Sequence, residues 1–258
     1  MSDSRVAISS ARRIVVKVGS SSISGENAGK IDALVAALAK SHDAGREVIL
    51  VSSGAIATGL PLFSLQSRPD DLATSQALAA VGQSRLIARY QEQLEKFSIL
   101  AGQVLLTSGD LEAAETRINA RRAMDRLLEL KVLPIVNEND TVATAEIRFG
   151  DNDRLAALVA VLVEADALVL LSDVDALYTA PPTKPGAVKI ENVSFEDDLS
   201  SVEIGGTSTG VGTGGAVTKV SAAKLANAAG IPVLLTSTDK VALALDGQNV
   251  GTLFESAK

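Results

Sequence analysis

The chain has 258 residues, of which 47% are hydrophobic and 3% aromatic, and it carries a formal net charge of −7. This length is enough to bury a sizeable core, which has to be built from Ala, Val, Leu and Ile. The negative charge argues against nucleic acid as a partner, and a sequence without cysteine excludes disulfides, thiolate nucleophiles and Cys-ligated metals.

The sequence also predicts a location and a domain division. The amino terminus has no apolar segment typical of a secretion signal, and Glu164 and Asp166 interrupt the longest apolar run. We therefore expect a soluble cytoplasmic protein with no membrane partner. Residues 1–12 are predicted to be a flexible amino terminus and residues 13–258 a single domain. The single histidine, His42, is expected to be a solvated residue near a helix end, which leaves little basis for histidine catalysis.

Predicted strands alternate with predicted helices along the whole chain. Strands are expected at residues 14–18, 48–51, 99–106, 132–136, 167–171, 232–235 and 252–254, and helices at residues 31–44, 75–97, 115–130, 151–164 and 216–229. Residues 172–187, which contain three prolines, are expected to form a loop. Such alternation is typical of a mostly parallel sheet with helices on both faces. The chain is therefore predicted to be an α/β protein with three layers, an αβα sandwich.

Two short polar stretches interrupt the apolar middle of the chain. Residues 137–140 (Asn-Glu-Asn-Asp) directly follow the predicted strand 132–136, and residues 150–153 (Gly-Asp-Asn-Asp) open a predicted helix with Asp151 as its N-cap. Taken alone, the first would be a polar turn and the second an ordinary cap. Together, around one strand exit, they suggest a ligand with an amino group and with hydroxyl or carboxyl oxygens.

Lys17 is the first candidate for chemistry. It lies inside the apolar predicted strand 14–18, where a charged side chain should be paired or should face a site. The alternative is a charge on an edge strand that discourages aggregation. Residues 19–22 (Gly-Ser-Ser-Ser) follow directly, and the backbone amides of such a turn can hold phosphate oxygens.

Two further segments have small residues that allow a ligand to approach the backbone. Residues 210–215 are rich in glycine and lead into a predicted helix that carries Lys219. This arrangement is a candidate phosphate clamp, although a mobile surface loop is the competing interpretation. Residues 52–59 leave a predicted strand with Ser, Gly, Ala and Thr, and they are either a ligand contact or a tight connection between strand and helix.

The set of segments as a whole resembles the amino acid kinase family. The matching pieces run in order along nearly the whole chain: residues 16–20, 52–57, 79–86, 137–140 with 150–153, 171–175, 212–215 with Thr218 and Lys219, and 250–254. The first piece and the Gly-rich piece are shared widely in the family and imply phosphoryl transfer to a carboxylate, carbamate or phosphate. The two polar stretches, with residues 80–86 (Ala-Val-Gly-Gln-Ser-Arg-Leu), are similar to the branch that phosphorylates glutamate.

That resemblance implies an amino acid kinase fold, ATP as donor with Mg²⁺, and L-glutamate as the acceptor of a phosphoryl group on its side-chain carboxylate, the first step toward proline. Lys17 and Lys219 would balance charge on the transferring group, and Asp153 would orient them. Glutamate would be held by Ser53, Asp140, Asn152 and Asn137. The residues implied for ATP are Lys17, Gly19, Ser20, Ser172, Asp173, Thr213, Gly214, Gly215, Ala216, Val217, Thr218 and Lys219. Mg²⁺ would be bound mostly by water and phosphate, with no metal ligand from the chain.

The resemblance also implies proline as a feedback inhibitor and a homo-oligomer, either a dimer or a tetramer. The chain stops soon after residues 251–254, so we expect no RNA-binding-like carboxyl-terminal domain. Two alternatives stay open. The acceptor could be another acid, such as acetylglutamate, aspartate or UMP. The chain could instead be a noncatalytic amino acid or nucleotide sensor that has kept the fold.

Overall fold

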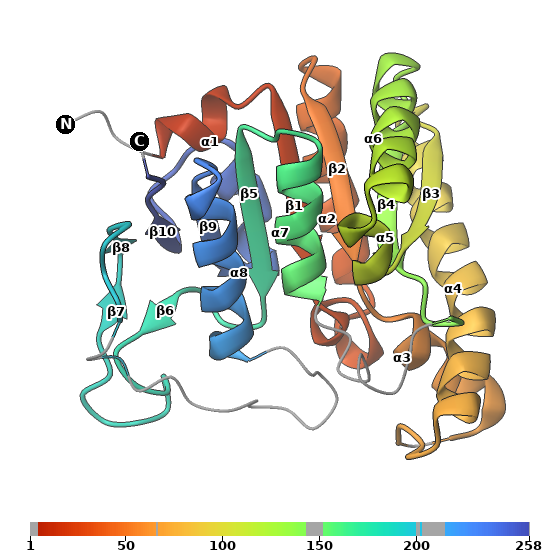
Figure 1. Ribbon diagram of the computed structural model, residues 1–258. Coiled ribbons are helices and arrows are strands. Elements are labelled where there is room, and N and C mark those ends of the chain that lie inside the picture. The colour runs from red at the N-terminus through yellow and green to blue at the C-terminus, as the bar shows by residue number, and fades with distance from the viewer. Residues whose placement is uncertain (1–4, 66, 143–151, 200–201, 203–214, 258) are drawn as a thin grey trace.

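The computed structural model describes residues 5–65, 67–142, 152–199, 202 and 215–257, and its centre is an eight-stranded sheet. In spatial order the strands are β3 (Ala101–Leu106), β4 (Leu133–Glu138), β2 (Glu47–Ser52), β1 (Arg13–Val18), β5 (Ala167–Ser172), β9 (Val233–Ser237), β10 (Thr252–Phe254) and β8 (Asn192–Val193). All neighbours pair in parallel except β9 and β10. The predicted mostly parallel sheet is thus confirmed (Figure 1).

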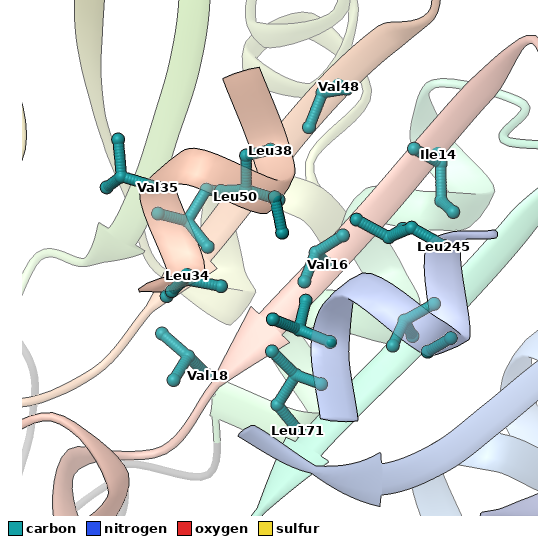
Figure 2. Packing of buried hydrophobic residues seen from close by; sticks show 14 of the residues in the cluster. Ile14, Val16, Val18, Leu34, Val35, Leu38, Val48, Leu50, Leu171 and Leu245 are labelled. Atoms are coloured by element: carbon teal, nitrogen blue, oxygen red, sulfur yellow. The ribbon is translucent and has the colours of Figure 1, made fainter. Parts of the chain in front are cut away.

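Helices cover both faces of this sheet. One face carries α1 (Val6–Ser10), α2 (Lys30–Asp43), α4 (Leu72–Glu95) and α9 (Val241–Leu245), and the other carries α5 (Ser108–Glu112), α6 (Ala114–Glu129), α7 (Asn152–Leu162) and α8 (Ala216–Ala228). Because side chains alternate along a strand, Val16 and its even-numbered neighbours in β1 pack against α2 and α9, as Figure 2 shows, while Val15 packs on the opposite face. The αβα sandwich follows from this alternation.

Several short elements differ from the sequence predictions. The predicted loop 172–187 contains β6 (Leu177–Tyr178), which pairs antiparallel with β7 (Lys189–Ile190) in a separate two-stranded sheet. Within the segment expected to be flexible, α1 forms and its Ile8 is fully buried, so this part is a packed helix. His42 lies in the last turn of α2, as predicted, but it is less solvated than expected: its side chain is only 16% exposed and its Nε2 atom lies 3.2 Å from the backbone oxygen of Lys131.

Two glycines bring α3 (Ala55–Gly59) and α4 into backbone contact. A Cβ atom at Gly82 in α4 would overlap the carbonyl oxygen of Ala55, and one at Gly59 would overlap that of Leu78. Only residues without a side chain permit this approach. The contact fixes the position of α4 relative to the chain that leaves β2.

No helix among the described residues is both long enough and apolar enough to cross a membrane.

Candidate functional site

The candidate site lies at the carboxyl ends of the parallel strands, where β1 is flanked by β2 on one side and by β5 on the other. The chain that leaves β1 returns to the sheet at β2, whereas the chain that leaves β5 runs to the opposite side of β1. Because these two connections leave in opposite directions, a crevice forms at the carboxyl ends of the strands. Lys17 is the next-to-last residue of β1 and shares a face with Val15, the face that α7 and α8 cover. Its side chain therefore meets the first turns of these two helices, and the edge-strand interpretation of Lys17 is wrong.

Two lysines converge on one carboxylate at this point. Lys17 Nζ lies 2.5 Å from Oδ1 of Asp153, and Lys219 Nζ lies 3.1 Å from its Oδ2. The hydroxyl of Thr218 donates to the same Oδ2 atom at 2.8 Å. Asp153 belongs to the first turn of α7, while Thr218 and Lys219 belong to the first turn of α8. Three elements that are distant in sequence thus meet at one carboxyl group.

The charged groups of this cluster are buried. Asp153 is fully buried, and the side chains of Lys17 and Lys219 are only 5% and 9% exposed. Burial alone would raise the pKa of Asp153, but the charges of the two lysines hold it well below its usual range. Two buried lysine ammonium groups that share one carboxylate form a place suited to an anionic ligand.

Backbone groups add to this positive field. The amino-terminal ends of α7 and α8 lie beside the lysines, and the partial positive charge of a helix start attracts anions. Gly19, at the exit of β1, approaches the cluster so closely that a Cβ there would lie 3.8 Å from Lys17 Nζ. Gly54 follows β2 and has a φ of 106°. It lies beside Ser20, because a Cβ atom at Gly54 would be 3.5 Å from the Cβ atom of Ser20. The crevice is therefore lined by backbone on the β1 and β2 side.

The β5 side of the crevice carries polar groups of a different kind. Ser172, the last residue of β5, donates from its hydroxyl to Oδ1 of Asp173 at 3.0 Å, and Asp173 is exposed. Just beyond, Asp175 accepts hydrogen bonds from Lys240 at 2.7 Å and from the hydroxyl of Tyr178 at 2.8 Å. The sequence analysis did not single out these last three residues as site residues.

A chain of amide side chains occupies the β2 and β4 side. Nδ2 of Asn152 donates to the backbone oxygen of Ser52 at 2.6 Å and to Oδ1 of Asn137 at 2.7 Å. Nδ2 of Asn137 donates in turn to Oε1 of Gln83 at 2.6 Å, and the backbone N–H of Glu138 donates to Asn137 Oδ1 at 2.9 Å. Gln83, Asn137 and Asn152 are almost fully buried, and so is Glu138. We call this arrangement the amide chain.

The amide chain borders a cavity of about 270 Å³ between α4, β3 and the exit of β4. The lining residues are Ala79, Ala80, Gln83, Ser84, Gln103, Leu105, Glu138, Asn139, Asp140 and Thr141. Burial raises the pKa of Asp140 to about 6, although the charge of Arg68 opposes this shift. A carboxylate in such a place is stabilised when a cation binds next to it.

The structure brings most of the predicted site residues to this one crevice, in the order of the strands. Asp140, Asn137, Asn152 and Ser53 lie on the β4 and β2 side; Lys17, Gly19, Ser20, Asp153, Gly215, Ala216, Val217, Thr218 and Lys219 at the centre; Ser172 and Asp173 on the β5 side. Thr213 and Gly214 lie outside the described residues, as does the predicted N-cap Asp151. Gln83 was not predicted as a site residue. The glycine before it was the available signal, because a close crossing at Gly82 places the next side chain against β4.

The chain is similar to several known proteins. Residues 12–237 match the model of the amino acid kinase family. The glutamate 5-kinase of Clavibacter sepedonicus is 70% identical over 251 residues, covering 97% of both chains, and that of Leifsonia xyli subsp. xyli is 65% identical over 257 residues, covering 99% of this chain and 95% of the relative. Among solved structures, a carbamate kinase from Giardia lamblia bound to AMP-PNP matches with a TM-score of 0.69, covering 96% of this chain and 99% of that one; at 16% identity it supports the fold alone.

Proposed function

Since the chain belongs to the amino acid kinase family, we propose that it transfers the γ-phosphoryl group of ATP to the side-chain carboxylate of L-glutamate, giving L-glutamyl 5-phosphate for proline biosynthesis. The observation that carries the proposal is the buried cluster in which Lys17 and Lys219 share one carboxylate, that of Asp153. A phosphoryl group, with its negative oxygens, is a ligand suited to two adjacent lysine ammonium groups. The near relatives named above supply the identity of the acceptor.

The cluster accounts for catalysis without a nucleophile from the protein. The acceptor carboxylate is already an anion at neutral pH, so the reaction needs no general base. It needs positive charge near the oxygens of the transferring phosphoryl group. It also needs the attacking oxygen, the phosphorus and the leaving oxygen to lie roughly in a straight line. Lys17 and Lys219 provide the charge from opposite elements, and Asp153 holds both ammonium groups in place. Because the lysines are fixed before the substrates bind, no reorganisation is required in the transition state.

We place the two substrates on opposite sides of the lysines, an arrangement that the order of strands in the sheet supports. ATP would bind toward β5, with Ser172 and Asp173 at the strand end and with the amides of Gly19, Ser20 and the first turn of α8 around its phosphates. L-glutamate would bind toward β2 and β4, held by Ser53, Asn137, Asn152 and Asp140. Thr213 and Gly214 complete the proposed ATP contacts.

Mg²⁺, bound together with ATP, would supply positive charge against the negative charge that develops on the transferring phosphoryl group. This ion keeps much of its water shell in kinases, so the donor set that it requires here is supplied mainly by ATP. Asp173, exposed at the end of β5, is the carboxylate on the ATP side that could contact such a hydrated ion. The lysine-bound Asp153 is already committed to two cations.

Four predictions of the sequence analysis accompany the proposal. Residues 13–258 would act as one domain, the protein would work in the cytoplasm, it would form a dimer or tetramer, and proline would compete with glutamate. Glutamate kinetics that stay unchanged at high proline concentration would dismiss the last of these for this protein.

An acceptor panel tests the proposal. The protein would be incubated with ATP, Mg²⁺ and single free amino acids, and acyl phosphate would be trapped with hydroxylamine. We expect hydroxamate from L-glutamate and little from L-aspartate or acetylglutamate. A preference for another acid would leave the fold in place and replace the acceptor. Binding of ATP and glutamate without any hydroxamate would favour the sensor.

A further inference from the structure

Gln83 lies where the amide chain meets the cavity, and the direction of its amide group can be derived from its neighbours. The backbone N–H of Glu138 can only donate, so the atom of Asn137 that it contacts at 2.9 Å has to be the oxygen Oδ1. The backbone carbonyl of Ser52 can only accept, which fixes Nδ2 of Asn152 in the same way. Two backbone groups thus set the polarity of the amide chain from both ends.

This polarity determines what Gln83 offers to the cavity. Asn137 directs Nδ2 toward Gln83, which has to answer with its acceptor Oε1, at 2.6 Å. The donor atom Nε2 therefore occupies the other position of the Gln83 amide, and Gln83 itself lines the cavity. A carboxylate is the natural partner of such a donor, because hydrogen bonds to an ionised acceptor are stronger than those between neutral groups.

We propose that Nε2 of Gln83 donates a hydrogen bond to the α-carboxylate of the acceptor amino acid and so makes Gln83 a specificity-determining residue. This inference rests on the proposed function, since it places the α-carbon end of L-glutamate in the cavity. The side-chain carboxylate of the acceptor then points from the cavity toward Lys17. Asn152 and Asp153, adjacent at the start of α7, join the two ends of the site.

Asp140 supplies the complementary half of the recognition. It lines the same cavity as Gln83, and its carboxylate suits the α-ammonium group of the acceptor. A zwitterion presents one cation and one anion at its α-carbon, and the cavity presents one carboxylate and one amide donor to match them. The shared cavity also contains Gln103, an exposed residue of β3, which offers a second amide from the outer rim and serves as a matched control.

Three acceptors distinguish the contact at the α-carboxylate from the contact at the α-ammonium group. L-Glutamate carries both α-groups, glutarate lacks the α-amino group, and 4-aminobutyrate lacks the α-carboxylate. We would measure kcat/KM for each with wild type and with Gln83→Met, which keeps the length of the side chain and removes both polar atoms. Where an analogue turns over too slowly, its inhibition constant against L-glutamate replaces kcat/KM in the comparison.

For Gln83→Met we expect kcat/KM to fall about 10- to 100-fold for L-glutamate and glutarate, with a change of about 3-fold or less for 4-aminobutyrate and for the KM of ATP. Gln83→Glu keeps an acceptor for Asn137 but turns an oxygen toward the α-carboxylate, so it should show the same selectivity with a larger loss. Gln103→Met should lower none of the three values more than about 3-fold.

Two results would overturn the inference. An equal fall for all three acceptors would mean that Gln83 only supports Asn137, and a carboxylate-selective loss in Gln103→Met would move the contact to β3. The proposed function fails separately, if wild type forms no acyl phosphate from L-glutamate. The same experiment therefore distinguishes the two failures: the inference fails on the pattern of losses in the variants, and the proposed function fails on the activity of the wild type.

Discussion

Strand β1 carries a cluster of charged side chains at each end, and the two clusters are built differently. At its carboxyl end, Lys17 joins Asp153 and Lys219 in the buried cluster described above. At its amino end a partly exposed network contains Arg12, Arg13, Glu47, Arg121, Asp125 and Glu164, with nitrogen to oxygen distances of 2.7–3.1 Å. We call this the amino-end network. Among the described residues, three arginines of this network pair with three carboxylates, whereas at the carboxyl end two lysines share the carboxylate of Asp153.

Burial distinguishes the two clusters. Water reaches the pairs of the amino-end network, whose side chains are 18–80% exposed, and screens them, so each pair contributes little to folding. The carboxyl-end cluster lies where water is scarce, since its three side chains are at most 9% exposed, so each charge there depends strongly on its partners. Both contain the same types of group, and a count of salt bridges would rank the amino-end network higher.

The largest expected effect is on catalysis at the carboxyl end. Lys17→Ala and Lys219→Ala should each lower kcat about 10³- to 10⁵-fold, because each removes fixed positive charge from the transition state. Steady-state kinetics with L-glutamate and ATP would measure this. Lys40→Ala is the control, since Lys40 pairs with Asp246 on the surface. Near-normal turnover in either site variant would contradict the role of that lysine.

The next effect concerns stability. Asp153→Asn should lower the free energy of unfolding by about 3–5 kcal/mol at pH 7, because two buried lysines lose their counter-charge. The lowered pKa of Asp153 means that its contribution is complete above the ordinary value of 3.8 and disappears as the pH falls further. Urea unfolding would measure the change, with Asp239→Asn on the surface as the control. An unchanged midpoint would show that the lysines are stable without the carboxylate.

A third prediction uses pH to distinguish the two carboxylates of the site. Asp140, with a pKa of about 6, is mostly ionised at pH 8 but only roughly one tenth ionised at pH 5, while Asp153 stays ionised throughout. Binding of the α-ammonium group requires the ionised form. We therefore expect kcat/KM for L-glutamate to fall about ten-fold between pH 8 and pH 5. The acid limb of this profile should flatten in Asp140→Asn, and a limb that persists would assign it to another group.

The smallest effect is expected at the amino end. Asp125→Asn removes the carboxylate that Arg13 and Arg121 share, yet the free energy of unfolding should change by only about 0–1 kcal/mol, because Asp125 and Arg121 are about a third exposed and both arginines keep other partners. Thermal unfolding at low and high salt would measure it, and kinetics should stay unchanged. A loss as large as that of Asp153→Asn would break the distinction between the two ends of β1.

Patterns repeated over many residues were sufficient to predict the layers from the sequence, but short elements were not. Strands such as β1 and β5 have continuous apolar runs, which predict strands that are covered on both faces of the sheet. The face on which each side chain lies follows from the alternation of side chains along a strand. In contrast, β6 and β7 have two residues each and exist only because they pair with each other, which no local pattern announces. Helix α1 was missed because its helical signal is five residues long and depends on burial of Ile8.

The site divides in the same way. Lys17 could be found because a charge inside an apolar strand is conspicuous, but its partners come from the starts of α7 and α8, and only the resemblance to a family linked them before the fold was known. Gln83 could not be found from its own residue type. It lies in the middle of the 24-residue helix α4, where glutamine is an ordinary helix former, and its role depends on tertiary contact with Asn137.

The glycine-mediated contact between α3 and α4 has a consequence for engineering. A library that varies residue types to change the acceptor would naturally include the whole segment 80–86, yet any side chain at Gly82 would push α4 away from Ala55 and carry Gln83 with it. Gly59 constrains the opposite side of the same contact. Redesign of the acceptor is therefore best confined to positions 83 and 140, with both glycines held constant as the geometric reference for the pocket.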